Sequence, residues 1–183
     1  FWPSLELRAR YPGIRFAPMP RTCWESYGMI QWGAWLDALP DIGPDELCCI
    51  TDADVVVQRD FDAKELARFS AYDDRTIGLG PNAGPDDTLA AEAQRIGLAR
   101  DEPRYPGDWA AIPVFNCGVM IARAGVFRQL RRAYDLEAAE FYRRTAHRSR
   151  CQWLICHLVH RLGLTVDVLG HDVHAHGHFG LPA

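Results

Sequence analysis

The stretch Leu47-Cys-Cys-Ile-Thr-Asp-Ala-Asp-Val-Val-Val57 decides the fold. Its apolar run contains neither glycine nor proline and has the length of a buried strand in a parallel sheet, which is continuously apolar rather than alternating. The run leads into two aspartates, Asp52 and Asp54. In open α/β sheets, ligands gather beyond the carboxyl ends of the strands. Two carboxylates there, one residue apart, can hold one hard divalent cation through oxygen ligands.

The composition is that of an ordinary globular domain. With 183 residues, the chain has the length of one domain, and we predict a single domain over residues 1–183. Hydrophobic residues make up 48% and charged residues 24%, which suits a packed core. The net charge of −4 gives no argument for nucleic acid or an anionic membrane as a partner.

The cysteines and the hydropathy indicate a cytoplasmic protein. None of the six cysteines forms a C-x-x-C pair, so a disulfide framework is not expected and a reducing compartment fits. No stretch has the length of a transmembrane helix, and no signal-peptide pattern is present. Because the chain begins with Phe1, we expect a fragment of a longer protein that lacks its first βα unit, with any membrane association through the missing parts.

The remaining pattern predicts alternating helices and strands, an α/β domain whose mainly parallel sheet is flanked by helices. Asp62 and Glu65 form a capping-box pattern at the start of a helix ending near Phe69. Further helices are expected at 2–10, 24–39, from Asp86 or Asp87 to 99, at 126–145 and at 151–162. Further strands are expected at 14–17, 76–79, 114–122 and 164–169. The proline-rich segment 101–113 is predicted to be a functional loop.

The second informative stretch is Val114-Phe-Asn-Cys-Gly-Val-Met-Ile-Ala122. An apolar strand here carries a polar Asn116 and a small Cys117-Gly118 pair near its start. A glycine inside a strand often marks the close approach of a ligand or another backbone. Asn116 and Gly118 are therefore candidates for a binding site, although a structural asparagine beside a tightly packed glycine would look the same.

The two aspartates by themselves allow three interpretations. They can be an ordinary polar strand end. They can be the nucleophile and general acid of a haloacid-dehalogenase-type phosphatase, with Asp52 attacking. They can also be a metal-binding D-x-D motif. The phosphatase interpretation needs a downstream lysine and a later acidic pair at a strand end, but the single lysine, Lys64, follows too closely, and the later acidic pairs fall in expected loops.

Three motifs taken in order resemble those of GT-A glycosyltransferases. Ile50–Val57, then Phe115–Ile121, then His174-Ala-His-Gly177 look like the "DAD", "FN-small-GV" and tail-histidine motifs of the glycogenin-like group, which contains retaining galactosyl- and glucosyltransferases. The resemblance implies a GT-A fold with three α/β/α layers. It also implies an enzyme that transfers a hexose from a nucleotide sugar, expected to be a UDP-sugar, to a carbohydrate or glycolipid acceptor.

The resemblance also assigns roles to residues. Asp54 and His174 would bind Mn²⁺ or Mg²⁺, Asp52 would contact the metal or the ribose, and His176 would compete with His174 because both face the same way in an extended strand. The resemblance assigns donor binding to seven residues, of which Asn116 and Gln152 are also assigned to catalysis: Asp52, Ala53, Asp54, Asn116, Cys117, Gly118 and Gln152.

The chain also departs from the family pattern. Relatives usually have an aspartate where this chain has Cys151, close to the reacting carbon of the sugar. This departure leaves a second hypothesis open, a non-catalytic domain that binds a sugar nucleotide.

Overall fold

The computed structural model describes Ala9 and residues 42–52, 59–81, 87–98, 104–145 and 152–170. The chain separates into two units, Phe1–Pro40 and Asp41–Ala183, and the elements described below belong to the second. Apart from Ala9, the elements expected at 2–10, 14–17 and 24–39 lie outside the described residues.

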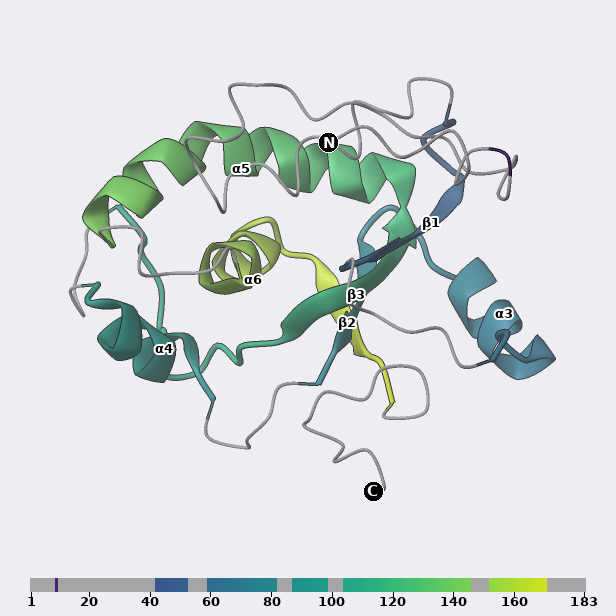
Figure 1. The fold of residues 1–183 in the computed structure, drawn as a ribbon, viewed down its shortest axis with the longest axis horizontal. Coiled ribbons are helices and arrows are strands. Elements are labelled where there is room, and N and C mark those ends of the chain that lie inside the picture. Colours follow the sequence, from purple (N-terminus) through teal and green to yellow (C-terminus); the bar gives the residue numbers. More distant parts are fainter. Residues whose placement is uncertain are drawn as a thin grey trace. The chain divides into compact units, whose positions relative to one another are not determined.

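Four described strands form one mixed sheet, so the chain is an α/β protein (Figure 1). They are β1 (Leu47–Thr51), β2 (Thr76–Gly80), β3 (Asn116–Arg123) and β4 (Thr165–Val168), in the spatial order β1-β3-β2-β4. β3 runs antiparallel to both β1 and β2, and β2 runs parallel to β4. The prediction of a mainly parallel sheet is therefore wrong for the described strands, because two of their three pairings are antiparallel. An apolar run indicates burial, but it does not encode the direction of the neighbouring strand.

The strand β1 forms as predicted but is not fully buried. It lies at one end of the described strand order and pairs only with β3 there. Cys48 and Ile50 are half-buried, whereas Leu47, Cys49 and Thr51 are exposed. The expectation of a buried parallel strand is therefore wrong on both counts, since β1 pairs antiparallel with β3 and is only partly buried. Because side chains alternate between the two faces of a strand, every second residue of β1 is exposed when one face is covered.

Helices cover both faces of the sheet around β3 (Figure 1). On one face Val119 and Ile121 pack in a buried cluster with Phe69 of α3 (Ala63–Ser70), Tyr72 and Leu169. Side chains alternate along a strand, so the buried Met120 and Ala122 point to the opposite face. There α5 (Ala124–Arg144) and α6 (Gln152–Arg161) both contact β3.

The helix α3 begins with the predicted capping box. The Asp62 carboxylate accepts from the Glu65 amide at 2.8 Å, and the Asp62 amide donates to the Glu65 carboxylate at 2.8 Å. Arg59 donates two further hydrogen bonds to Glu65, at 2.8 and 2.7 Å. These bonds, first those of Arg59 and then that of the Asp62 amide, lower the pKa of Glu65 to about 2. The first turn of α3 is thus fixed by charge-assisted hydrogen bonds.

The helix α4 spans Leu89–Ile96 and is shorter than predicted. Its N-cap is Thr88, whose hydroxyl accepts from the Ala91 amide at 3.3 Å, and not Asp86 or Asp87. Asp87 instead pairs with Arg95 at 3.3 Å. Gly97 adopts a left-handed φ of 76° and ends the helix before the expected Ala99, because glycine takes this conformation without a steric cost.

An aromatic cluster joins α5, α6 and the segment between α4 and β3. Trp153 lies in its centre, with ring centroids 5.4 Å from Phe141 and 5.3 Å from His157 in stacked arrangements. Tyr105 and Trp109, which are 1% and 4% exposed, meet Trp153 edge-on at 5.5 and 5.1 Å. The described part of the expected functional loop 101–113 therefore contributes side chains to the core.

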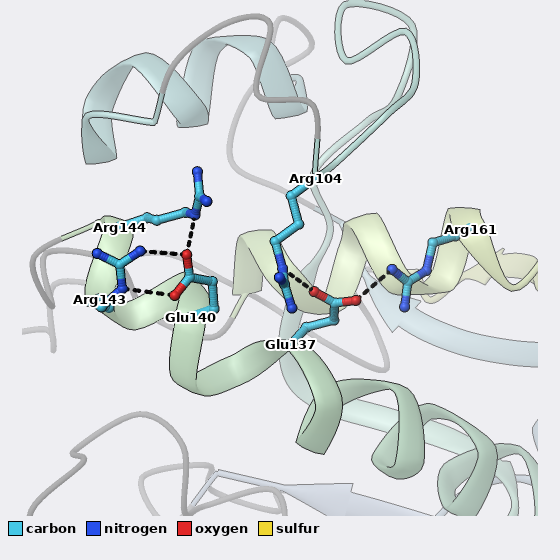
Figure 2. Close-up of polar contacts among 6 residues, drawn as sticks. All are labelled: Arg104, Glu137, Glu140, Arg143, Arg144 and Arg161. Carbon is cyan, nitrogen blue, oxygen red and sulfur yellow. Dashed lines mark hydrogen bonds and ion pairs between the residues drawn. The ribbon is translucent and has the colours of Figure 1, made fainter.

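Ion pairs tie the same three elements together on the outside of this cluster (Figure 2). Glu137 of α5 accepts from Arg104 at 2.9 Å and from Arg161 of α6 at 3.0 Å. One turn further along, Glu140 accepts from Arg143 and Arg144 at 2.6 to 2.7 Å. Several arginines of α5 are thus engaged in pairs on the surface, as expected of a solvated helix face.

In the described part of the chain, no helix has both the length and the apolar character needed to cross a membrane.

Gly78 of β2 leaves room for Tyr72, which follows α3, and for Leu169, which follows β4, and replacing it should destabilise the fold. A Cβ at this position would lie 2.8 Å from the Tyr72 hydroxyl and 3.0 Å from Leu169 Cδ2, and that hydroxyl donates to Asp167 at 2.5 Å. We expect Gly78→Ala to lower the free energy of unfolding by roughly 1–3 kcal/mol, measured by urea denaturation. In a Tyr72→Phe background the cost should be smaller; an equal cost in both backgrounds would contradict the proposed clash.

His157 should make the stability depend on pH between 6.5 and about 4. Its ring is fully buried, and neither of its nitrogens has a hydrogen-bond partner among the described residues. Burial first, and then the positive charges of Arg161 and His160, lower its pKa from 6.5 to about 4, against the opposing effect of Glu137. In this window the unfolded chain takes up a proton that the folded chain does not. Stability contributed by the neutral ring is present above pH 6.5 and falls as the pH drops.

The expected slope from this one group is at most about 1.4 kcal/mol per pH unit, measured by urea denaturation across the window. His157→Phe should remove that part of the slope. The matched control is His160→Gln, on the exposed side of the same helix, which should keep most of it. A slope unchanged by His157→Phe would rule His157 out as its source.

Candidate functional site

The two strand motifs meet where β1 ends. Thr51 pairs with Val119, and the next residue, Asp52, donates its amide to the Gly118 carbonyl at 2.8 Å. The ladder between β1 and β3 therefore continues one residue beyond β1, and the partly exposed Asp52 comes to lie beside the Asn116-Cys117-Gly118 motif. Two stretches that lie far apart in the sequence thus form one local structure.

A side-chain turn and a bulge shape the start of β3. The buried Asn116 accepts the Gly118 amide on its side-chain oxygen at 2.7 Å. Towards β2 the register breaks: Leu79 pairs with Met120, but the next residue, Gly80, pairs with Asn116. The residues between Asn116 and Met120 therefore bulge out of the β2 ladder while Gly118 remains bonded to Asp52. Bulges of this kind redirect side chains and are frequent next to functional sites.

Gln152 is linked to this motif through its own helix. It is the first residue of α6, and Cys156 follows one turn later. The Phe115 amide donates to the Cys156 sulfur at 3.3 Å, and the Cys156 thiol donates to the Phe115 carbonyl at 3.5 Å. Residues four apart share a face of a helix, so Gln152 lies on the side of α6 that meets the start of β3. Cys156, one turn after Gln152, makes the hydrogen bonds between α6 and the residue before Asn116.

Cys156 is the site residue that the sequence did not single out, and Phe115 belongs to the expected motif but was assigned no role of its own. The Cys117 thiol also donates to the Phe115 carbonyl, at 3.6 Å, so this one peptide contacts two thiols. The signal available in the sequence was the four-residue spacing from Gln152 to Cys156. Sequence alone, however, did not show which helix face would meet β3.

The predicted metal ligands are only partly described. Asp52 is described, whereas Asp54, His174 and His176, like the donor-binding candidate Ala53, lie outside the described residues. Within residues 42–170 as far as they are described, no group of three or more histidine, cysteine or acidic side chains is arranged to hold a metal. The described contribution to a hard-cation site is thus one partly exposed carboxylate at a strand end, the oxygen ligand that Mg²⁺ and Mn²⁺ prefer.

No protein-family model, no curated protein and no solved structure matches this chain.

Replacing Asn116 should destabilise the start of β3. Asn116→Ala removes the acceptor of the Gly118 amide in a buried position, and leaving such a donor unpaired costs roughly 1–3 kcal/mol. Asn116→Asp keeps an acceptor oxygen and should recover part of this loss at neutral pH. Urea denaturation of the three proteins tests the order; an alanine variant as stable as the wild type would show that the turn contributes nothing.

Proposed function

We propose that this chain is a glycosyltransferase of the GT-A type that transfers a hexose from a UDP-sugar to a carbohydrate or glycolipid acceptor with the help of a divalent cation. The observation that carries the proposal is the hydrogen bond from the Asp52 amide to the Gly118 carbonyl at 2.8 Å. It brings Asp52, the first residue of the expected D-x-D motif, beside Gly118 of the Asn-Cys-Gly motif, and this supports a common donor site.

The residues divide into a metal-binding set and a sugar-binding set. Asp54 and His174, with Asp52 and the alternative His176, would hold Mn²⁺ or Mg²⁺. When bound, the cation would supply Lewis-acid assistance to the departing diphosphate. Ala53 belongs to the same nucleotide-contacting stretch.

The sugar-binding set is expected along the start of β3 and the first turn of α6. The turn closed by Asn116 fixes the backbone of Cys117 and Gly118, so that backbone groups would meet the donor sugar in a set orientation. Gln152 would add an amide from the first turn of α6. Holding the donor in one orientation is the main service that such groups give to a transfer reaction.

A cytoplasmic location is part of the proposal. The described cysteines, Cys48, Cys49, Cys117 and Cys156, are free thiols, which supports a reducing compartment.

Calorimetric titration with Mn²⁺ and UDP tests the metal–diphosphate site. The wild-type chain should bind UDP only when Mn²⁺ is present. Asp54→Ala should weaken that binding at least tenfold, which is about 1.4 kcal/mol. Asp60→Ala removes an exposed carboxylate a few residues later and serves as the matched control, with affinity unchanged. A wild type that does not bind UDP, or an Asp54→Ala variant that binds like the wild type, would refute the site.

A second candidate is a non-catalytic domain that binds a sugar nucleotide, favoured by the departure at Cys151. UDP release from a panel of UDP-sugars separates the two. Turnover above the Asp54→Ala background supports the transferase, and binding without turnover supports the non-catalytic domain.

A further inference from the structure

Two thiols from different elements meet at one peptide beside the candidate donor site. Cys117 of β3 and Cys156 of α6 donate to the same Phe115 carbonyl oxygen, at 3.6 and 3.5 Å. Because both sulfurs contact one atom, they lie no farther apart than the sum of these distances, about 7 Å. The residues are 7% and 2% exposed, so the pair is enclosed by protein.

The local backbone allows the two sulfurs to approach each other. Cys117 lies in the bulge of β3, where the register with β2 is broken. Rotation about the Cα–Cβ bond moves a cysteine sulfur between staggered positions. A disulfide requires the sulfurs to reach about 2.05 Å, so its formation needs side-chain rotation together with a shift of the bulge.

We propose that Cys117 and Cys156 form a reversible redox modification site that a small peroxide closes into a disulfide. Hydrogen peroxide oxidises one thiolate to a sulfenic acid, and the displaced hydroxide takes a proton to become water. The second thiolate then attacks the sulfenic sulfur, the S–S bond forms, and a second water leaves. In sum, two thiols and one peroxide give one disulfide and two waters. A peroxide is small enough to enter where larger oxidants are excluded.

Closing the disulfide would disturb the peptide before Asn116. Both S–H groups that the Phe115 carbonyl accepts are lost, and the Cys156 sulfur that accepts the Phe115 amide has to move. The peptide would then reorient between Asn116 and α6. This consequence for ligand binding rests on the proposed function; the formation of the disulfide does not.

The adjacent pair Cys48 and Cys49 provides an internal comparison. Neighbouring residues of a strand point to opposite faces, so these two thiols do not face each other. Burial, and then the negative charge of Glu46, raise the pKa of the Cys48 thiol, which lowers its thiolate fraction and its reactivity. Neither is expected to enter the disulfide.

Mass spectrometry of the full chain tests the site. The reduced protein is treated with hydrogen peroxide, digested with trypsin without reduction, and searched for the peptide Tyr105–Arg123 linked to Cys151–Arg161. The second peptide also contains Cys151, so two variants assign the bond. The link should persist in Cys151→Ser, disappear in Cys156→Ser, and be reversed by dithiothreitol. In Cys156→Ser, Cys117 has lost its partner and should proceed to the sulfinic acid.

Three results would overturn the proposal. The first is a link that is lost in Cys151→Ser but kept in Cys156→Ser. The second is a Cys117 that reaches the sulfinic acid at the same peroxide dose in the wild type and in Cys156→Ser. The third is that Cys117 and Cys156 both stay reduced at peroxide doses that oxidise the exposed Cys49.

A parallel UDP titration with Mn²⁺ separates this proposal from the proposed function. If both hold, the oxidised chain binds UDP several-fold more weakly than the reduced chain. If the reduced chain does not bind UDP, the proposed function fails, while the linked peptides still decide the redox site.

Discussion

The described structure depends on β3 being hydrogen-bonded along both edges. It pairs antiparallel with β1 on one side and with β2 on the other, and its last residue, Arg123, leads directly into α5. The Arg123 guanidinium donates to the carbonyls of Tyr72, Asp45 and Ser70 at 2.8, 2.5 and 2.7 Å. One side chain thus joins the end of α3, the approach to β1 and the start of α5, and it holds the sheet in register at the end opposite the candidate site.

At the other end of β3, helix α6 provides the support. Trp153 and His157 fix its inner side in the aromatic cluster, where Trp153 also donates to the Leu89 carbonyl at 2.8 Å. Cys156, on the same helix, holds the Phe115 peptide. The core thereby sets the position of the peptide that precedes Asn116. A bulge that has left the β2 ladder needs such support, since backbone groups away from a ladder are otherwise held only weakly.

Elements whose signals are local were predictable. The capping box of Asp62 and Glu65 and the strands β2 and β4 follow from residues close together in the sequence, and their bounds agree with the structure to within about two residues. The N-cap of α4 was not predictable with the same certainty, because Asp87 and Thr88 are both good capping residues. Asp87 pairs with Arg95, which left the cap to Thr88. The aromatic residues of 104–113 looked like a loop because their core partner, Trp153, lies in a later helix.

The sequence by itself determined the α/β class, most of the described elements and the two motifs that contain Asp52 and Asn116. The tertiary structure decided the direction of β3, the exposure of β1 and the meeting of Asp52 with Gly118. It also brought two thiols to the Phe115 carbonyl. Each of these depends on which strand or helix face lies next to another, and hydrophobic periodicity shows that a face is buried without naming the element that covers it.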